Sequence, residues 1–252
     1  MSLRLLAFLF CSIAGLHAGP VFYTMSYAAS PVFGTIDANT GAVTPIGVPL
    51  TGYGHDLAVS PSGAVYAIVD DNLFTIDKTT GLASLIGALP ADAQSLAFRS
   101  DGTLFLGSTS DLFMVNPATG SGTLIGAMNL PANADNVRFD AAGNLYVMSA
   151  ESNSGLYRLS TLTGSSTFIG SSGQDDISLG AFYGGVFLGT NAPVTGQIVT
   201  VDPATGAATA GAPVNGIYLL ALDPTSVPEP GTFGLLLASA ALAGVVRARR
   251  IG

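Results

Sequence analysis

The stretch that decides the fold runs from Thr200 to Gly206 and reads Thr-Val-Asp-Pro-Ala-Thr-Gly. An alternating apolar run precedes its aspartate, Pro-Ala enters the turn, and Thr-Gly leaves it. Glycine tolerates the left-handed backbone conformation that ends a short hairpin loop. The stretch therefore predicts two short strands joined by a tight turn.

Related stretches occur four more times, and their closing glycines are 39 to 44 residues apart: Gly41, Gly81, Gly120, Gly164 and Gly206. A second apolar run follows each of them and ends at Ile-Gly in the first four copies. Another hairpin pattern lies between the copies, with turn glycines at Gly63, Gly102, Gly143 and, more loosely, Gly185. Each unit of about 40 residues thus contains four short strands with turns between them.

Four strands per unit, repeated radially, are typical of a β-propeller. Residues 21–26 match the second strand of a unit, and residues 218–224 match only a first strand. Joined, the two ends complete one blade, so we predict an all-β propeller with five four-stranded blades, closed by a blade that the termini share. The repeats resemble those of bacterial surface propellers with Asp-Pro-Ala-Thr-Gly turns, over residues 21–224. That resemblance implies a fold and no activity.

The first residues are typical of a secretory signal. Arg4 precedes an apolar run at residues 5–16, and small residues around Ala18 suit a signal peptidase. The run is short for a membrane span of about 20 residues, so we expect cleavage after Ala18 rather than a first anchor. The only cysteine, Cys11, would leave with this segment, so the mature protein would have no thiol chemistry.

The C-terminal end combines three features. Residues 232–246 carry no charge and predict a transmembrane helix, which is closed by Arg247, Arg249 and Arg250. The residues that precede the helix form an extended segment that a processing enzyme can bind: Val227, Pro228, Glu229 and Pro230. The helix would reach about 22 Å, less than the ~30 Å hydrocarbon core, which favours a transient anchor.

This order of features resembles the PEP-CTERM sorting signal over residues 227–252. The resemblance implies processing by an exosortase in a Gram-negative bacterium, and proteins of this family are associated with exopolysaccharide and biofilm. We expect a signal peptide at residues 1–18, a propeller at 19–226 and the sorting signal at 227–252. The protein would be exported, held transiently in the membrane by its helix, and delivered to the cell surface or extracellular matrix. A plain anchor after a proline-containing linker is the alternative.

The charge balance limits the partners. The chain has 16 acidic and 8 basic residues, and half of the basic ones lie in the two tails. Nucleic acid and anionic lipid require clustered lysine and arginine, so neither is expected as a partner of the propeller. His55 is the only histidine outside the signal, which excludes multi-histidine metal sites. We predict no cofactor; residues 70–72 and 175–176 leave one structural calcium ion open, although neither matches a calcium loop.

Candidate ligand-binding residues lie in the loops before the innermost strands, because these loops open onto the channel of a propeller. They place polar or acidic groups at one mouth: His55, Asp56, Gln94, Asp135, Asn136, Asp175, Asp176, Asn215 and Tyr218. Converging hydrogen-bonding groups with a tyrosine suit a sugar or a cation. A propeller mouth is also polar simply because it is wet, so this pattern alone does not decide between the two.

We expect a non-catalytic binding or structural module that contacts polysaccharide or another matrix protein, and we assign no catalytic residue. The alternative is a glycan lyase or hydrolase acting at the channel mouth. It would need carboxylates about 5–10 Å apart, one of them with a raised pKa. Asp56, Asp135 and Asp176 are the residues that would have to converge.

Overall fold

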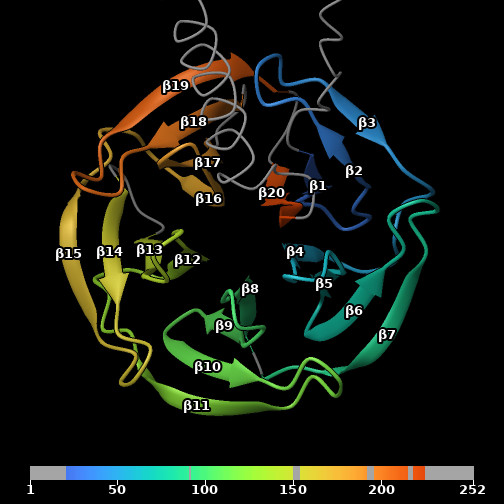
Figure 1. The fold of residues 1–252 in the computed structure, drawn as a ribbon, viewed down its shortest axis with the longest axis horizontal. Coiled ribbons are helices and arrows are strands. Elements are labelled where there is room, and N and C mark those ends of the chain that lie inside the picture. The colour runs from blue at the N-terminus through green and yellow to red at the C-terminus, as the bar shows by residue number, and fades with distance from the viewer. Residues whose placement is uncertain (1–20, 91, 150–153, 192–195, 215–217, 225–252) are drawn as a thin grey trace, which may run out of the picture.

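The computed structural model describes residues 21–90, 92–149, 154–191, 196–214 and 218–224. These residues form five antiparallel four-stranded sheets, arranged as blades around a central axis (Figure 1). The prediction of an all-β, five-bladed propeller is confirmed. The predicted C-terminal helix lies outside the described residues.

Four blades are continuous in sequence, and in each the chain runs from the axis outward. The first contains β4 (Gly54–Val59), β5 (Val65–Val69), β6 (Asn72–Ile76) and β7 (Ala83–Ala88). The second contains β8 (Ala93–Phe98), β9 (Leu104–Ser108), β10 (Asp111–Val115) and β11 (Gly122–Ala127). The third contains β12 (Ala134–Phe139), β13 (Leu145–Ser149), β14 (Gly155–Leu159) and β15 (Ser166–Ser171). The fourth contains β16 (Ile177–Tyr183), β17 (Val186–Asn191), β18 (Gln197–Val201) and β19 (Ala208–Pro213).

The fifth blade is shared between the two ends of the described chain, as predicted. Its innermost strand is β20 (Tyr218–Leu222), and the other three are β1 (Phe22–Ser26), β2 (Phe33–Ile36) and β3 (Val43–Pro45). β20 pairs with β1 in antiparallel register, with Phe22 opposite Leu222. This pairing closes the ring and covers strand edges that would otherwise be open.

In the repeated Thr-Gly turns, the side chain of the first residue stabilises the turn by accepting backbone hydrogen bonds. In the copy at residues 77–81, the carboxylate of Asp77 accepts hydrogen bonds from the backbone nitrogens of Thr79 and Thr80, at 2.9 and 2.7 Å. These bonds hold the pKa of Asp77 below its usual value. Gly81 has a φ of 72°, in the left-handed region that glycine adopts without strain. The local chemistry of this stretch therefore fixes the hairpin.

The same glycines join the blades. A Cβ atom on Gly81 would collide with the backbone oxygen of Ile46, and one on Gly47 would collide with that of Thr80. The Ile-Gly end of one blade thus packs directly on the Thr-Gly turn of the next. Equivalent close approaches join the other blades, for example Gly126 with Gly164. The two recurring glycine positions are a requirement of blade-to-blade packing as well as of the turn.

Apolar side chains fill five clusters, one between each pair of neighbouring blades. In one of them Met25 and Phe33 of the shared blade pack with Leu57 of the next blade. In another, the ring of Phe187 meets that of Tyr146 at a centroid distance of 5.1 Å. The core therefore consists of five apolar clusters arranged around the channel, and their packing positions the innermost strands.

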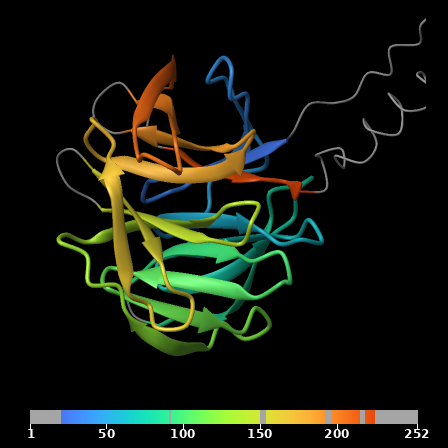
Figure 2. The same ribbon diagram turned by 60° about the vertical axis from the view of Figure 1, so that its left-hand side comes forward.

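The two faces of the disc differ in their connections. The loops between blades lie on one face with the turns that join second to third strands; we call it the upper face. The remaining turns, including the Thr-Gly turns, lie on the lower face. β1 begins and β20 ends on the lower face, on the same side of the molecule (Figure 2). The described chain therefore enters and leaves the propeller at the lower face.

Candidate functional site

The innermost strands β4, β8, β12, β16 and β20 surround the central channel (Figure 1). In the four continuous blades these strands start at the upper face, and their second residues are half-buried there: His55, Gln94, Asp135 and Ser178. In β4, β8 and β12 the register with the neighbouring strand shifts at this point. A bulge of this kind turns the side chain away from the regular pleat. We call these four side chains and their surroundings the upper mouth.

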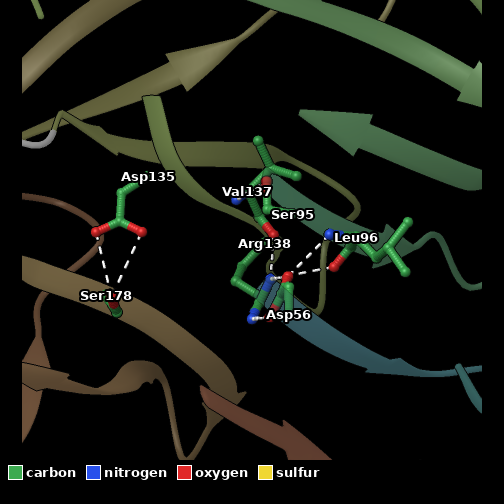
Figure 3. Close-up of polar contacts among 7 residues, drawn as sticks. All are labelled: Asp56, Ser95, Leu96, Asp135, Val137, Arg138 and Ser178. Carbon is green, nitrogen blue, oxygen red and sulfur yellow. Dashed lines mark hydrogen bonds and ion pairs between the residues drawn. The ribbon is translucent and has the colours of Figure 1, made fainter. Parts of the chain in front are cut away.

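A buried ion pair lies below the upper mouth (Figure 3). The guanidinium of Arg138 donates to both carboxylate oxygens of Asp56, at 2.7 and 2.8 Å. It also donates to the backbone oxygens of Leu96 and Val137, and the backbone nitrogen of Leu96 donates to Asp56 at 2.8 Å. The network thus links β4, β8 and β12. The side chains of Asp56 and Arg138 are 0% and 8% exposed, so the pair is almost inaccessible to solvent.

The lower half of the channel is lined by apolar side chains together with Arg138, and polar and apolar atoms contribute about equally to the exposed surface there. A cavity of about 130 Å³ lies there, and all five innermost strands contribute to its lining. The sixth residues of the four continuous innermost strands form its lower rim: Val59, Phe98, Phe139 and Phe182. Each of the three phenylalanines also packs against an aromatic ring of a second strand, namely Tyr66, Phe105 and Phe187. Arg138 is the charged residue among the cavity's lining, and Asp56 neutralises it.

Asp135 has the most perturbed carboxyl group of the upper mouth. Ser178 on the next blade donates to it, at 3.2 Å to one oxygen and 3.4 Å to the other (Figure 3). Its pKa is raised to about 7, mainly by burial, while the Ser178 bond and the Arg138 charge oppose the rise. The negative charges of Asp56 and Asp176 add to it. Near neutral pH this carboxyl is therefore present in both its protonated and its ionised form.

Three aromatic rings form a cluster at the upper face: Tyr27, Tyr53 and His55. Tyr27 and Tyr53 make an edge-to-face contact at 4.9 Å, and the ring of His55 lies 5.4 Å from Tyr53 and 6.1 Å from Tyr27. The pKa of Tyr27 is raised, first by burial, then by Tyr53 and by the charge of Asp135. The phenol of Tyr27 is therefore within electrostatic reach of the Asp135 carboxyl.

The backbone fixes both tyrosines. The nitrogen of Tyr53 donates to the carboxylate of Asp70 at 2.8 Å, and the nitrogen of Asp70 donates back to the oxygen of Tyr53 at 2.7 Å. The nitrogen of Gly54 donates to the oxygen of Ala28, next to Tyr27, at 3.0 Å. The two loops that carry the rings are thus bound to each other before any ligand arrives, which lowers the entropy lost on binding.

The structure brings together only part of the predicted site. His55, Gln94 and Asp135 lie at the upper mouth, and Asp176 is close enough to influence the pKa of Asp135. Asp175 is exposed in the same loop as Asp176, whereas Asp56 and Asn136 are buried below the mouth. The backbone of Tyr218 belongs to β20, but its side chain, Asn215 and all predicted residues of the sorting signal lie outside what the structure describes.

Sequence reasoning missed Tyr27, Tyr53, Ser178 and Arg138. Tyr27 lies between a second and a third strand, and the repeats place such turns on the same face as the loops between blades. The position of this turn in the repeat could therefore have predicted that Tyr27 lies on the upper face. Arg138 could have been singled out as well, because the equivalent residues of the other continuous blades are Ala58, Ala97 and Ala181.

Two further observations bear on the predictions. Among the described residues, no group of three or more histidine, cysteine, aspartate or glutamate side chains is arranged to hold a metal ion. Within the described ranges, no helix is long and apolar enough to cross a membrane. The predicted anchor at residues 232–246 lies outside those ranges.

Comparison with known protein families gives one match, at residues 226–250, to the PEP-CTERM protein-sorting motif. The chain carries a PEP-CTERM sorting signal. This signal marks an exported protein with a C-terminal membrane-anchoring segment that an exosortase processes. The match agrees with the segment that the sequence predicted, and it says nothing about the chemistry of the propeller.

Solved structures resemble the propeller. A chain of a nidogen–laminin complex aligns with a TM-score of 0.57 and 10% identity, over 81% of this chain and 98% of that one. TolB from Acinetobacter baumannii aligns with a TM-score of 0.53 and 13% identity, over 78% of this chain and 53% of that one. A Kuenenia stuttgartiensis hydrazine synthase chain gives a TM-score of 0.47 and 11% identity, over 64% and 49%. This chain spans about half the length of the last two. At such identities the first two likenesses support the fold alone.

No curated protein matches the chain in sequence.

Proposed function

We propose that the mature protein is a non-catalytic binding module of the cell surface or extracellular matrix of a Gram-negative bacterium, and that it binds exopolysaccharide at the upper mouth. One observation carries this proposal: two half-exposed tyrosine rings lie on the face of the propeller where the innermost strands of three blades present hydrogen-bonding groups. Aromatic faces with convergent polar groups suit the apolar face and the hydroxyls of a sugar. Such a module would contribute to a biofilm matrix.

The path of the chain supports this function. β20 ends at Leu222 on the lower face, and the sorting motif starts at residue 226. The predicted membrane helix begins at residue 232, ten residues after Leu222, and ten residues span at most about 35 Å, so the tether leaves from the lower face. While the protein is anchored, this tether would keep the lower face nearer the membrane and leave the upper mouth available to extracellular polymer.

The limits of the mature protein belong to the same proposal. Signal peptidase would remove residues 1–18, and the exosortase would act at or near residues 228–230, leaving the propeller of residues 19–226 as the working part. Intact-mass measurement of the exported protein tests these limits. Recovery of the full C-terminal tail in the membrane fraction would reject processing at this site.

A glycan array tests the binding function. The exported protein should bind a subset of bacterial polysaccharides, and Tyr53→Ala should weaken binding about tenfold, because a well-placed aromatic contact contributes about 1 kcal/mol or more. Tyr183→Ala is a matched control, since Tyr183 is 38% exposed and lies at the lower end of β16 whereas Tyr53 is 36% exposed. An array that stays blank, or equal losses from both variants, would contradict binding at the upper mouth.

A second candidate is a glycan lyase or hydrolase, and the raised pKa of Asp135 favours it, because a general acid needs such a value. Asp56 is engaged with Arg138, which leaves Asp176 as the second carboxylate of that hypothesis. Incubation of the protein with the polysaccharides that it binds would test the idea. Chain cleavage that Asp135→Asn abolishes would favour the enzyme, and intact polymer would favour the binding module.

A further inference from the structure

The two faces of the propeller carry different charge. Seven carboxylates of the described residues lie on the upper face, in its loops and turns or at the strand ends beside them: Asp70, Asp71, Asp92, Asp111, Asp135, Asp175 and Asp176. No lysine or arginine among the described residues lies on that face. The upper face therefore attracts cations and repels anions.

The basic side chains of the described residues lie elsewhere. Lys78 pairs with Asp223 at 3.1 Å and Arg99 with Asp101 at 2.6 Å, both on the lower face. Arg158 donates to Asn144, in a lower-face turn. Arg138 lies inside the channel, where Asp56 neutralises it. Within the described residues, Arg138 is thus the cation that acts on Asp135 of the upper mouth, and its charge is paired with that of Asp56.

The upper mouth has the groups that bind an organic ammonium ion. Tyr27 and Tyr53 are 39% and 36% exposed, and their rings meet at nearly a right angle, 89°. Two such rings present faces and edges around one point, and a cation over an aromatic face is attracted by the ring quadrupole. Asp135 supplies an opposite charge within electrostatic reach of Tyr27. Rings and a carboxylate together recognise an ammonium group better than either alone.

A hydrogen-bonding group beside the rings also lacks a partner. The Nδ1 atom of His55 is buried and has no hydrogen-bond partner among the described residues. A buried polar atom without a partner costs about 1–3 kcal/mol, so a ligand hydroxyl that reaches it would gain affinity. A sugar hydroxyl next to an amine can make this contact while the amine lies between the rings and Asp135.

From these contacts we propose that the upper mouth binds the primary ammonium group of an unacetylated amino sugar, so that the ligand is a cationic polysaccharide. This inference rests on the proposed polysaccharide binding and specifies the class of sugar. The exposed carboxylates around the mouth would hold further ammonium groups of the same polymer. Uronate-containing, sulfated and phosphorylated polymers would be repelled, and neutral polymers would lack the ionic contact.

Binding should depend on pH in a defined way. The pKa of Asp135 is about 7, so at pH 5 this carboxyl is neutral and attracts an ammonium group weakly. An ammonium ligand stabilises the ionised form and draws the proton off, so affinity rises with pH until the sugar amine itself begins to lose its proton. The other charged or titratable groups that face Asp135 are Asp56, Arg138 and Asp176, with Tyr27 close by.

A matched pair of oligosaccharides tests the inference. An oligomer of glucosamine and the same oligomer fully N-acetylated have equal length and linkage and differ only in charge. Isothermal titration of the exported, processed protein at pH 7 should show about tenfold tighter binding of the amine form, as expected for one partly desolvated cation–π contact with an ionic contact. In the acid range where the sugar amine is fully protonated, affinity for the amine form should fall as Asp135 takes up its proton, and the N-acetylated form should show no such change.

Two variants locate the contact. Asp135→Asn should remove most of the preference for the amine form, and Asp101→Asn, which removes one carboxylate from the lower face, should leave it unchanged. Equal loss from both variants would mean diffuse attraction and would overturn the site. Equal binding of the two oligomers would overturn the amine preference while leaving polysaccharide binding intact. Failure to bind these and all other glycans would remove the proposed function as well.

Discussion

The two ends of the channel are built from the same strands, yet they differ in chemistry. The upper mouth carries His55, Gln94, Asp135 and Ser178, and the lower rim, four residues further along each strand, carries Val59, Phe98, Phe139 and Phe182. In β4, β8 and β12 a bulge lies at the second residue, so this side chain is turned out of the regular alternation that runs on to the sixth residue. One repeat can therefore present a polar mouth and a lower rim of apolar side chains on the same strands.

The comparison also separates positions that repeat from positions that vary. The Thr-Gly turns and Ile-Gly ends recur because each packs on its neighbour, and any side chain there would collide. The channel positions carry no such requirement. Where three blades have alanine, at residues 58, 97 and 181, the third blade has Arg138, and its partner Asp56 stands where the other blades have Ser95, Asn136 and Leu179. The two residues that depart from the repeat, Asp56 and Arg138, thus pair with each other inside the channel.

The largest expected effect comes from removing the ion pair inside the channel. Arg138→Met leaves the Asp56 carboxylate buried without its partner, with only the backbone nitrogen of Leu96 as a described donor to it. We expect a loss of about 3–5 kcal/mol in the free energy of unfolding, the usual cost of an unpaired buried charge. Urea unfolding of the variant and the parent protein measures it.

A double variant separates charge from packing. Asp56→Asn combined with Arg138→Met removes both charges and keeps an oxygen that accepts from the nitrogen of Leu96. Most of the lost stability should return, because a buried ion pair and well-packed neutral side chains of similar volume often stabilise equally. A double variant as unstable as Arg138→Met would contradict the view that the unpaired charge causes the loss.

The sequence predicted the fold well because its signals are local. The turn chemistry around Gly206 and its four copies, the spacing of the copies and the incomplete units at the two ends led directly to five blades and a shared one. The site was predicted only in part. His55, Gln94 and Asp135 follow from the position of their loops, but the Asp56–Arg138 pair joins residues 82 positions apart on different blades. No period predicts such a contact, because only the closed ring places these two side chains in one channel.

A smaller effect is expected at the lower end. Phe182 lines the cavity and packs edge-on against Phe187, with a centroid distance of 5.1 Å. Phe182→Ala should lower the free energy of unfolding by about 2 kcal/mol, less than the 3–5 kcal/mol typical of a fully buried phenylalanine, because this side chain is half-buried. Glycan binding should not change, since Phe182 belongs to the lower rim and the upper mouth lies at the other end of the channel. A parallel loss of binding would mean that the two ends of the channel are coupled.

The smallest expected effect is a difference between the two faces in how a carboxyl group makes stability depend on pH. Asp135 keeps its proton up to a pKa of about 7 in the folded protein, whereas its ordinary value is 3.8. Between these values the folded state binds more protons than the unfolded state, so the contribution of Asp135 to stability falls as pH rises and is fully unfavourable above about pH 7. Asp135→Asn should therefore match the parent protein near pH 4 and exceed it by about 1–2 kcal/mol at pH 8, where the full shift would give about 4 kcal/mol before water at the mouth reduces it.

Asp101 on the lower face should contribute to stability with the opposite dependence on pH. Its pKa is held below the ordinary value, first by the bond with Arg99 and then by bonds with Thr103. A carboxyl with a depressed pKa stabilises the folded state above its unfolded pKa and loses that contribution as pH falls. Asp101→Asn should thus lower stability at pH 8 and make little difference in acid, the reverse of Asp135→Asn. Thermal unfolding of both variants across pH 4 to 8 compares them directly, and two curves of the same sign would contradict the assignment of a buried, proton-binding carboxyl to the upper mouth alone.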